Sequence, residues 1–215
     1  MVINRKSKTD MSGLYVVFKH SAINEVEGFR GISHLIEHLL CKSLKPYYSK
    51  MDADNVEYNA YTSDSEVVFY MAGLERCLEK YRDIFVRAIT TYEFSKVELN
   101  TEKKIVLDEI LSYEGDQQVT HYHNLFIDKF NLYGPAGCKE DIKALTYKQC
   151  KAYTDTFFRK PSLIINVSKK CTSYSPDKDI RFSTDKYNTG MAIASPDAVR
   201  TFSTDNIFED RSAVS

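Results

Sequence analysis

The sequence predicts a protein of the α+β class, built on an antiparallel sheet. Two β-rich runs, residues 55–62 and 66–71, are separated only by the polar segment Ser63-Asp64-Ser65, and this pattern predicts a hairpin. The longer segments that follow carry apolar side chains at helical spacing. A hairpin followed by several amphipathic helices is typical of domains in which helices cover an antiparallel sheet.

The first part of the chain predicts a strand, a loop and a helix. Residues 14–19 (LYVVFK) are apolar and β-rich, as a buried strand requires, and residues 20–30 read as a polar loop. A helix is predicted over about residues 31–42, because Pro46 disfavours its continuation. Residues 47–54 predict a short helical turn before the hairpin.

The chain after the hairpin predicts mainly helices. Apolar side chains recur every three or four positions in four segments, residues 75–91, 94–113, 119–130 and 141–158. Thr146 is a candidate internal cap in the last of these helices. Residues 162–167 are again a short apolar run and predict a last buried strand.

The character of the sequence changes near its end. From Lys169 onward serine, threonine, aspartate and lysine dominate, and apolar residues lose their periodicity. We therefore divide the chain into a domain over residues 1–168 and a polar C-terminal extension over residues 169–215. The extension is expected to be partly ordered or to dock on a partner.

Composition excludes several classes of function. The 215 residues are 43% hydrophobic with a net charge of −1, which describes a globular protein and offers no basic excess for nucleic acid. No apolar stretch approaches the roughly 18–20 residues that a membrane-spanning helix needs. The basic N-terminus lacks the apolar segment of a secretory signal. The five cysteines are irregularly spaced without a C-x-x-C pair, which favours reduced thiols and a cytoplasmic location.

The segment with the clearest chemistry is H-x-x-E-H, formed by His34, Glu37 and His38. On a helix the two histidines lie one turn apart on one face, and Glu37 projects toward the same side. Two imidazoles at this spacing can hold one Zn²⁺, and a neighbouring carboxylate can take a proton from metal-bound water. The alternative is a helix whose polar residues merely face solvent. Cys41 is either a competing ligand or, as free cysteines more often are, a buried apolar residue.

Two further groups of residues have metal-ligating side chains. Glu102 and Glu109 lie seven residues apart, so they share one side of the helix predicted over residues 94–113. A solvated acidic face is the alternative for this pair. His121 and His123 are two residues apart and point away from each other on a helix, which disfavours a shared metal.

Four blocks, in order, resemble the M16 metallopeptidases, the family of pitrilysin, insulin-degrading enzyme and the mitochondrial processing peptidase. Residues 31–38 resemble its G-x-x-H-x-x-E-H signature, and residues 59–62 (NAYT) resemble its N-A-x-T strand. Residues 102–110 resemble its helix with two glutamates seven apart, and residues 137–142 resemble a glycine-led stretch. The resemblance covers about residues 14–167, and it implies a sheet with helices packed mainly on one face.

The resemblance implies a metal site and assigns its residues. His34, His38 and Glu109 correspond to ligands of one zinc ion per chain, and Glu37 corresponds to the general base. Glu102 corresponds to an acidic residue that supports the site. Three protein ligands leave a fourth position for water, whose pKa the metal lowers.

The resemblance also implies a substrate site on the N-A-x-T strand. Asn59 corresponds to a residue that contacts substrate near the cleaved bond. Its neighbours Ala60 and Tyr61 are expected to pair with an extended peptide by strand addition.

The implied activity is that of a zinc endopeptidase cleaving peptides or extended protein segments. Members of the family resemble two homologous halves, and this chain resembles the catalytic half alone, so we expect a second M16-like half as its partner. The alternative is an interaction subunit that binds a partner or peptide without cleaving it. Three departures from the family pattern are Cys41 in place of a phenylalanine, a shortened interval between His38 and Glu109, and little room before Leu14 for an edge strand.

Overall fold

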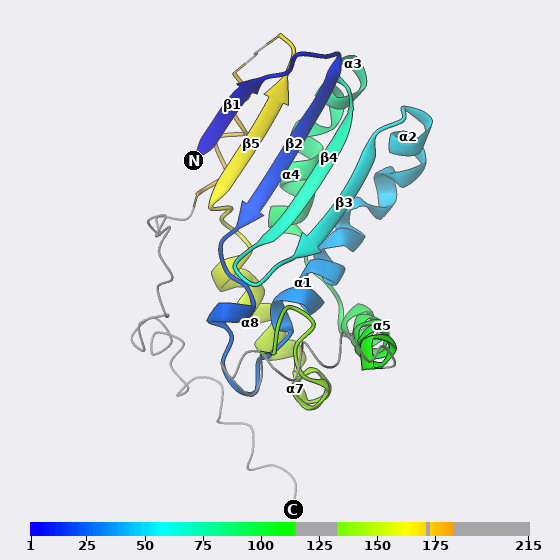
Figure 1. Ribbon diagram of the computed structural model, residues 1–215, viewed down its shortest axis with the longest axis vertical. Helices are drawn as coiled ribbons and strands as arrows, with labels where there is room; N and C mark the ends of the chain where they lie inside the picture. The colour runs from blue at the N-terminus through cyan, green and yellow to red at the C-terminus, as the bar shows by residue number, and fades with distance from the viewer. Residues whose placement is uncertain (115–132, 171–172, 183–215) are drawn as a thin grey trace, which may run out of the picture.

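The computed structural model describes residues 1–114, 133–170 and 173–182, and its centre is a five-stranded sheet (Figure 1). The strands follow the order β1-β5-β2-β4-β3. Their bounds are β1 Val2–Lys6, β2 Met11–Phe18, β3 Glu57–Thr62, β4 Val67–Leu74 and β5 Leu163–Ser168. Every pair is antiparallel except β1 with β5, which is parallel. The helices cover one face of the sheet, so the predicted α+β class is confirmed.

Strand β1 corrects the expectation that little room exists for an edge strand before Leu14. Val2–Lys6 pairs in parallel with β5, in a register that places Asn4 opposite Asn166. The Asn166 amide donates to Asn4 Oδ1 at 2.8 Å across this pair. Polar and charged side chains are common on edge strands, where they discourage pairing with other chains, and here they obscured the strand pattern.

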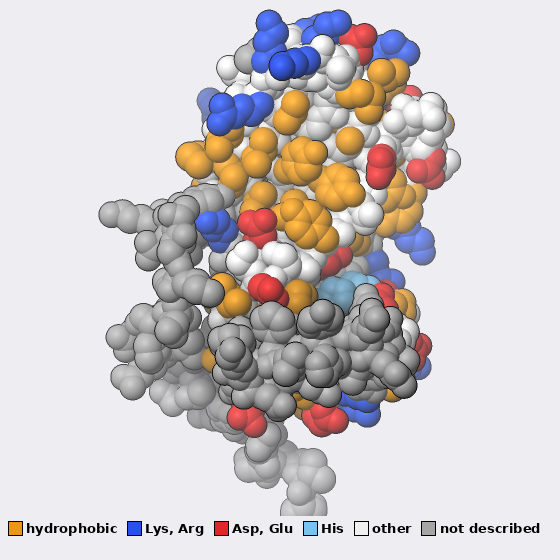
Figure 2. All heavy atoms as spheres, in the orientation of Figure 1, with side chains coloured by type: hydrophobic (Ala, Val, Ile, Leu, Met, Phe, Trp, Pro, Cys, Tyr) orange, Lys and Arg blue, Asp and Glu red, His pale blue; other side chains and the backbone are white. Residues whose placement is uncertain are grey.

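The sheet buries apolar side chains on both of its faces. Leu14, Val16 and Phe18 alternate along β2 and are fully buried toward the helices. The intervening residue Val17 belongs to a second cluster on the opposite face, with Val68 and Leu163. Figure 2 shows apolar side chains gathered over that open face of the sheet.

The helices largely follow the prediction. The observed helices are η1 Ala22–Asn24, α1 Ile32–Cys41, η2 Lys42–Tyr47, α2 Tyr48–Ala53, α3 Glu75–Leu78, η3 Glu79–Tyr81, α4 Arg82–Thr91, α5 Lys96–Glu114, α7 Lys139–Ala144 and α8 Tyr147–Phe157, where η denotes a 3₁₀ helix. The helix predicted over residues 119–130 and its histidines lie outside the described residues. No described helix is long and apolar enough to cross a membrane.

The single helix predicted over residues 141–158 is wrong, because the chain forms two helices there. Leu145 adopts φ −52° and ψ 128°, which ends α7. Thr146 is the N-cap of α8, and its side chain accepts from the Gln149 N–H, while the Gln149 side chain accepts from the Thr146 N–H. This reciprocal capping box starts a new helix at the residue that the sequence suggested as an internal cap.

Residues 173–182, in the predicted extension, contact the domain. The Tyr174 N–H donates to Asn4 Oδ1 at 2.9 Å, and its hydroxyl donates to Asp83 Oδ1 at 2.9 Å. Ile180 and Phe182 pack against the main core. The division of the chain after residue 168 remains a prediction.

Two glycines allow a loop to pass very close to the start of α1. Gly31 has φ +91° and Gly137 has φ +77°, a region that side chains disfavour. A Cβ on Gly137 would lie 2.2 Å from Gly31 Cα, so no side chain fits there. This contact fixes the N-terminus of α1 against residues 134–137.

We expect Gly137→Ala to lower the free energy of unfolding by about 3 kcal/mol or more, because it combines an unfavourable φ with a clash against backbone. Gly134→Ala is the matched control, since Gly134 also has a positive φ (+68°) but nothing lies within 4 Å of its Cβ position. The control should lose about 1–2 kcal/mol. Urea denaturation measures the free energy of unfolding of both variants. Equal losses would show that the close approach of Gly137 to Gly31 does not add to the cost of the substitution.

Candidate metal centre

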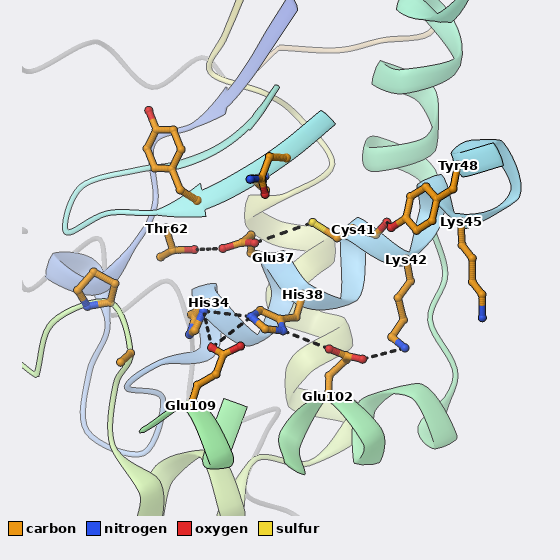
Figure 3. Close-up of a pocket in the computed structure, with 15 residues that line it drawn as sticks. His34, Glu37, His38, Cys41, Lys42, Lys45, Tyr48, Thr62, Glu102 and Glu109 are labelled. Carbon is orange, nitrogen blue, oxygen red and sulfur yellow. Dashed lines mark hydrogen bonds and ion pairs between the residues drawn. The ribbon is translucent and has the colours of Figure 1, made fainter. Parts of the chain in front are cut away.

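Helices α1 and α5 bring three metal-ligating side chains together. His34 and His38 lie one turn apart on α1, and their Nε2 atoms are 3.1 Å apart. Glu109 reaches them from α5, with Oε2 3.6 Å from each Nε2 atom. Figure 3 shows the three side chains pointing toward one another. Among the described residues, this is the one group of His, Cys, Asp or Glu side chains whose ligand atoms converge in this way.

The spacing of these three atoms fits a tetrahedral ion. Ligand atoms at roughly 2.0–2.1 Å from Zn²⁺ are separated by about 3.4 Å along the edges of a tetrahedron. The observed separations of 3.1 and 3.6 Å lie on either side of that value. Two imidazoles and one carboxylate are also a donor set that zinc enzymes use, and it leaves one position open.

Glu102 orients one of the two histidines. Its Oε2 atom lies 3.2 Å from His38 Nδ1, and its Oε1 atom lies 2.8 Å from the Lys42 ammonium. The Glu102 side chain is only 6% exposed, so its carboxylate oxygens need these partners in a buried position. A carboxylate that accepts the Nδ1 proton leaves Nε2 with its lone pair toward the metal position.

His34 lacks such a partner. Its Nδ1 atom is buried and has no hydrogen-bond partner in the described part of the chain. Burial, and then the neighbouring charge of His38, lower the pKa of His34 to about 4. At neutral pH the His34 ring is therefore uncharged, as a metal ligand must be.

Glu37 lies beside the three donors and is 8% exposed. The Thr62 hydroxyl donates to its Oε2 atom at 2.9 Å. Burial raises the pKa of Glu37, against the opposing effect of the Thr62 hydrogen bond. A carboxylate whose pKa is raised in this way is better suited to take up a proton than an exposed one.

Cys41 is turned toward Glu37, with its Sγ atom 3.9 Å from Glu37 Oε1. It is partly buried against the main core and is not part of the converging group. Burial raises the pKa of its thiol. Cys41 therefore lines the wall of the site as a neutral thiol.

The position of α1 depends on a cap supplied from outside the helix. The Glu25 carboxylate accepts hydrogen bonds from the Gly31 N–H at 2.5 Å and the Ser33 N–H at 2.8 Å. A carboxylate at this place satisfies N–H groups that have no partner within the helix, and it also complements the helix dipole. The opposite side of α1, including Leu35 and Leu39, is fully buried.

A cleft of about 1000 Å³ runs along α1 and η2 beneath the edge strand β3. Among the described residues strand β3 pairs with β4 alone, which leaves its other edge open for pairing in that part of the structure. Asn59, Ala60 and Tyr61 line the cleft from this strand. The Asn59 side chain accepts from the Ala60 N–H at 2.8 Å, so its amide is held against its own backbone.

All the residues that the sequence singled out as candidate site residues line this one cleft; they are His34, Glu37, His38, Asn59, Ala60, Tyr61, Glu102 and Glu109. Sequence reasoning missed two contacts. Thr62 was recognised in the strand block without a role, and it holds Glu37. Lys42 lies four residues after His38, on the same side of the helix, which was the signal available for its contact with Glu102.

Residues 1–133 match the family described as insulinase (peptidase family M16). The chain belongs to this family. The β subunit of mouse mitochondrial-processing peptidase is 25% identical over 155 residues, which are 66% of this chain and 31% of that protein. The Helicobacter pylori zinc protease PqqE is 23% identical over 172 residues, which are 75% of this chain and 39% of that protein.

Solved structures support the same fold for this M16 chain. A protease from Helicobacter pylori superposes with a TM-score of 0.71 at 20% sequence identity, over 91% of this chain and 50% of that one. The chain thus resembles one half-domain of an M16 protease. It spans only about a third of the length of the curated M16 relatives named above.

The Glu25 cap makes the stability of this M16 half-domain depend on pH. Burial raises the pKa of Glu25 from 4.5 to about 7, although the Gly31 and Ser33 N–H groups oppose that shift. An acid with a raised pKa in the folded state costs nothing below its unfolded pKa and destabilises the fold once it ionises. Glu25 should therefore lower the free energy of unfolding progressively between about pH 4.5 and pH 7, by roughly 1–3 kcal/mol.

Replacing Glu25 with Gln keeps one oxygen acceptor and removes the ionisation. We expect the unfolding free energy of Glu25→Gln to rise relative to wild type by that amount as the pH increases from 4.5 to 7. Denaturant titrations at several pH values measure the difference, with Glu27→Gln at an exposed neighbouring position as the control. A difference that does not change with pH would contradict the assignment.

Proposed function

We propose that this chain carries the active site of a zinc endopeptidase that hydrolyses peptides or extended protein segments. The observation that carries the proposal is the convergence of His34, His38 and Glu109, with the buried Glu37 carboxylate beside them. Membership of the M16 family and the zinc protease among the relatives support it. Zinc and peptide hydrolysis are thus family properties, and the roles given below to single residues are our proposal.

His34, His38 and Glu109 would hold the zinc ion. When bound, zinc supplies a Lewis acid that polarises the scissile carbonyl and lowers the pKa of water. Glu37 then moves protons: its carboxylate accepts one from the attacking water and returns it to the leaving amine. Thr62 fixes one Glu37 oxygen, and Glu102 fixes the His38 ring.

The substrate would bind as an added strand on the free edge of β3. Asn59, Ala60 and Tyr61 belong to that strand and line the same cleft as the converging side chains. Backbone hydrogen bonds along the edge would hold the peptide largely without regard to sequence.

A second M16-like half is the proposed partner. One solved relative is about twice the length of this chain, and one curated relative is described as a subunit. The partner would enclose the substrate from the side that faces away from this chain, which would supply the cleft and the metal ligands.

The second candidate is an interaction subunit that binds a partner without cleaving it. The complete ligand set and the buried Glu37 favour catalysis, because a binding subunit has no need to preserve their geometry. The experiment below also distinguishes these two functions.

Glu109→Gln should lose most zinc, and Glu37→Gln should keep about one zinc per chain and lose hydrolysis. A loss of about 10³-fold or more is expected for Glu37→Gln, which removes the proton acceptor from the reaction. Metal analysis of the purified chains and cleavage of a peptide library test both predictions. Asp108→Asn is the control, because Asp108 is the exposed neighbour of Glu109 on α5.

Retained cleavage in Glu37→Gln would exclude the proposed mechanism. Zinc binding without cleavage, in the wild-type chain alone and with candidate partner halves, would favour the interaction subunit.

Lys42 should strengthen zinc binding through Glu102 and His38. Lys42→Met removes the cation that faces Glu102 and should weaken zinc roughly three- to tenfold, because residues behind a ligand tune its affinity. Lys45→Met is the matched control for the loss of a positive charge in the same cleft, and it should not weaken zinc. Competition with a zinc chelator measures the zinc affinity of each variant. Lys42→Arg keeps a cation beside Glu102 and should bind zinc about as tightly as the wild type. Equal losses of zinc affinity in Lys42→Met and Lys45→Met would contradict a role of Lys42 through Glu102 and His38.

A further inference from the structure

The charged side chains are unevenly distributed along the cleft (Figure 3). The three carboxylates that line it lie around the two histidines, and each has a polar contact described above. Next to Glu102 and beyond it, the charged side chains are the two lysines of η2, Lys42 and Lys45, and Lys45 lies farther from the histidines. Lys42 is paired with Glu102, whereas Lys45 is exposed and has no ion-pair partner within the described ranges.

The neighbours of Lys45 fix the position of its backbone. Leu44, next to it, is 3% exposed and belongs to the main core, and Pro46 follows directly. The Tyr48 ring stacks on Tyr58 of β3, with ring centroids 4.6 Å apart. This stack connects the wall formed by α1 and η2 with the wall formed by β3. Lys45, three residues before Tyr48, therefore lies near one end of the cleft.

The two walls also set the direction of a bound peptide. Strand β3 runs from Tyr58, at the lysine end, to Thr62, which contacts Glu37. A peptide added antiparallel to β3, the commoner arrangement, would run from Glu37 toward Lys45. Residues at the lysine end would therefore lie C-terminal to the cleaved bond.

The helical rise gives the number of peptide residues between the two ends. From Glu37 to Lys45 the chain passes through the end of α1 and the start of η2, a distance of roughly 12–14 Å along the axis. A strand advances about 3.4 Å per residue, so the same distance corresponds to about four residues. The long lysine side chain can also reach back toward the third.

We propose that the cleft favours peptides with a carboxylate three or four residues C-terminal to the cleaved bond, and that Lys45 recognises it. The proposal rests on the peptide site proposed above. An aspartate or glutamate side chain and the free C-terminus of a short peptide offer the same chemistry. Because Lys45 is exposed, its ion pair should improve binding only about two- to fivefold.

The test uses the full zinc-loaded chain and a matched set of neutral extended peptides. Members of the set carry Glu or Gln at each position after the cleaved bond, with either a free or an amidated C-terminus. Fluorescence anisotropy measures binding, and mass spectrometry of the products locates the cleaved bond. Lys45→Gln and Lys45→Glu are compared with Lys50→Gln, which removes an exposed lysine of α2 outside the cleft.

The wild-type chain should bind the Glu peptides two- to fivefold more tightly than the Gln peptides at the third or fourth position. Lys45→Gln should abolish this preference, Lys45→Glu should reverse it, and Lys50→Gln should retain it. The preference should also fall in 1 M salt, where the screening length is only about 3 Å. Amidated Glu peptides carry only the side-chain carboxylate, and Gln peptides with a free C-terminus carry only the terminal one. Comparing the two shows which carboxylate Lys45 recognises.

The outcomes separate this inference from the proposed function. If the chain prefers peptides with a carboxylate but cleaves none of them, the proposed role of Lys45 stands and the proposed endopeptidase activity is wrong. Cleavage with equal use of Glu and Gln, or with a preference that survives in Lys45→Gln, would overturn the assignment and leave the endopeptidase. Failure of the folded, zinc-loaded chain to bind any of the peptides would overturn it as well.

Discussion

The packing of α1 between the sheet and α5 is the constraint on which the rest of the structure depends. One side of this helix is apolar and buried against the strands, and the other carries His34, Glu37 and His38 toward α5 and β3. Because both sides are set by one 3.6-residue period, a rotation that optimises core packing also aims the polar residues. A slip of one residue would rotate α1 by about 100° and misplace both sides together. The Glu25 cap and the Gly31–Gly137 approach, which fix the start of the helix, therefore act on the site from outside it.

Electrostatic repulsion is a second constraint, and it acts on the carboxylates that line the cleft. Several acids close together in a half-buried cleft repel one another, and contacts with cations or hydrogen-bond donors offset that repulsion. Glu102 contacts the Lys42 ammonium and His38 Nδ1, and Glu109 Oε2 lies 3.6 Å from the Nε2 atom of each histidine. Within the described part of the chain, Glu37 accepts hydrogen bonds from the Thr62 hydroxyl and the Cys41 thiol, and burial raises its pKa. The carboxylate whose pKa burial raises is thus the one proposed to exchange protons.

The parts of this structure that could be predicted from sequence are those encoded by local patterns. The H-x-x-E-H spacing and the glutamates seven apart each fix residues on one face of one helix, so the metal donors could be named before the helices were placed together. Strand β1 could not be found in this way, because its pairing partner lies about 160 residues further along and its own side chains are largely polar. The break between α7 and α8 depends on the extended backbone of Leu145, which an apolar periodicity does not reveal. The contacts of Thr62 and Lys42 required the packing of β3 and α5 on α1.

The distribution of functions within the cleft follows from this arrangement. The proposed metal donors, the proposed base and the residues that contact them all belong to this chain, so the proposed second half would not be needed to assemble the ligands or to move the proton. The second half would add contact with the peptide and exclusion of water, because in the described structure β3 would bind a peptide through a single edge. Backbone hydrogen bonds along β3 would hold a peptide whatever its sequence. Selectivity for particular peptides would then come from side chains at the ends of the cleft. At the end away from the metal donors, the charge available for that selection is positive.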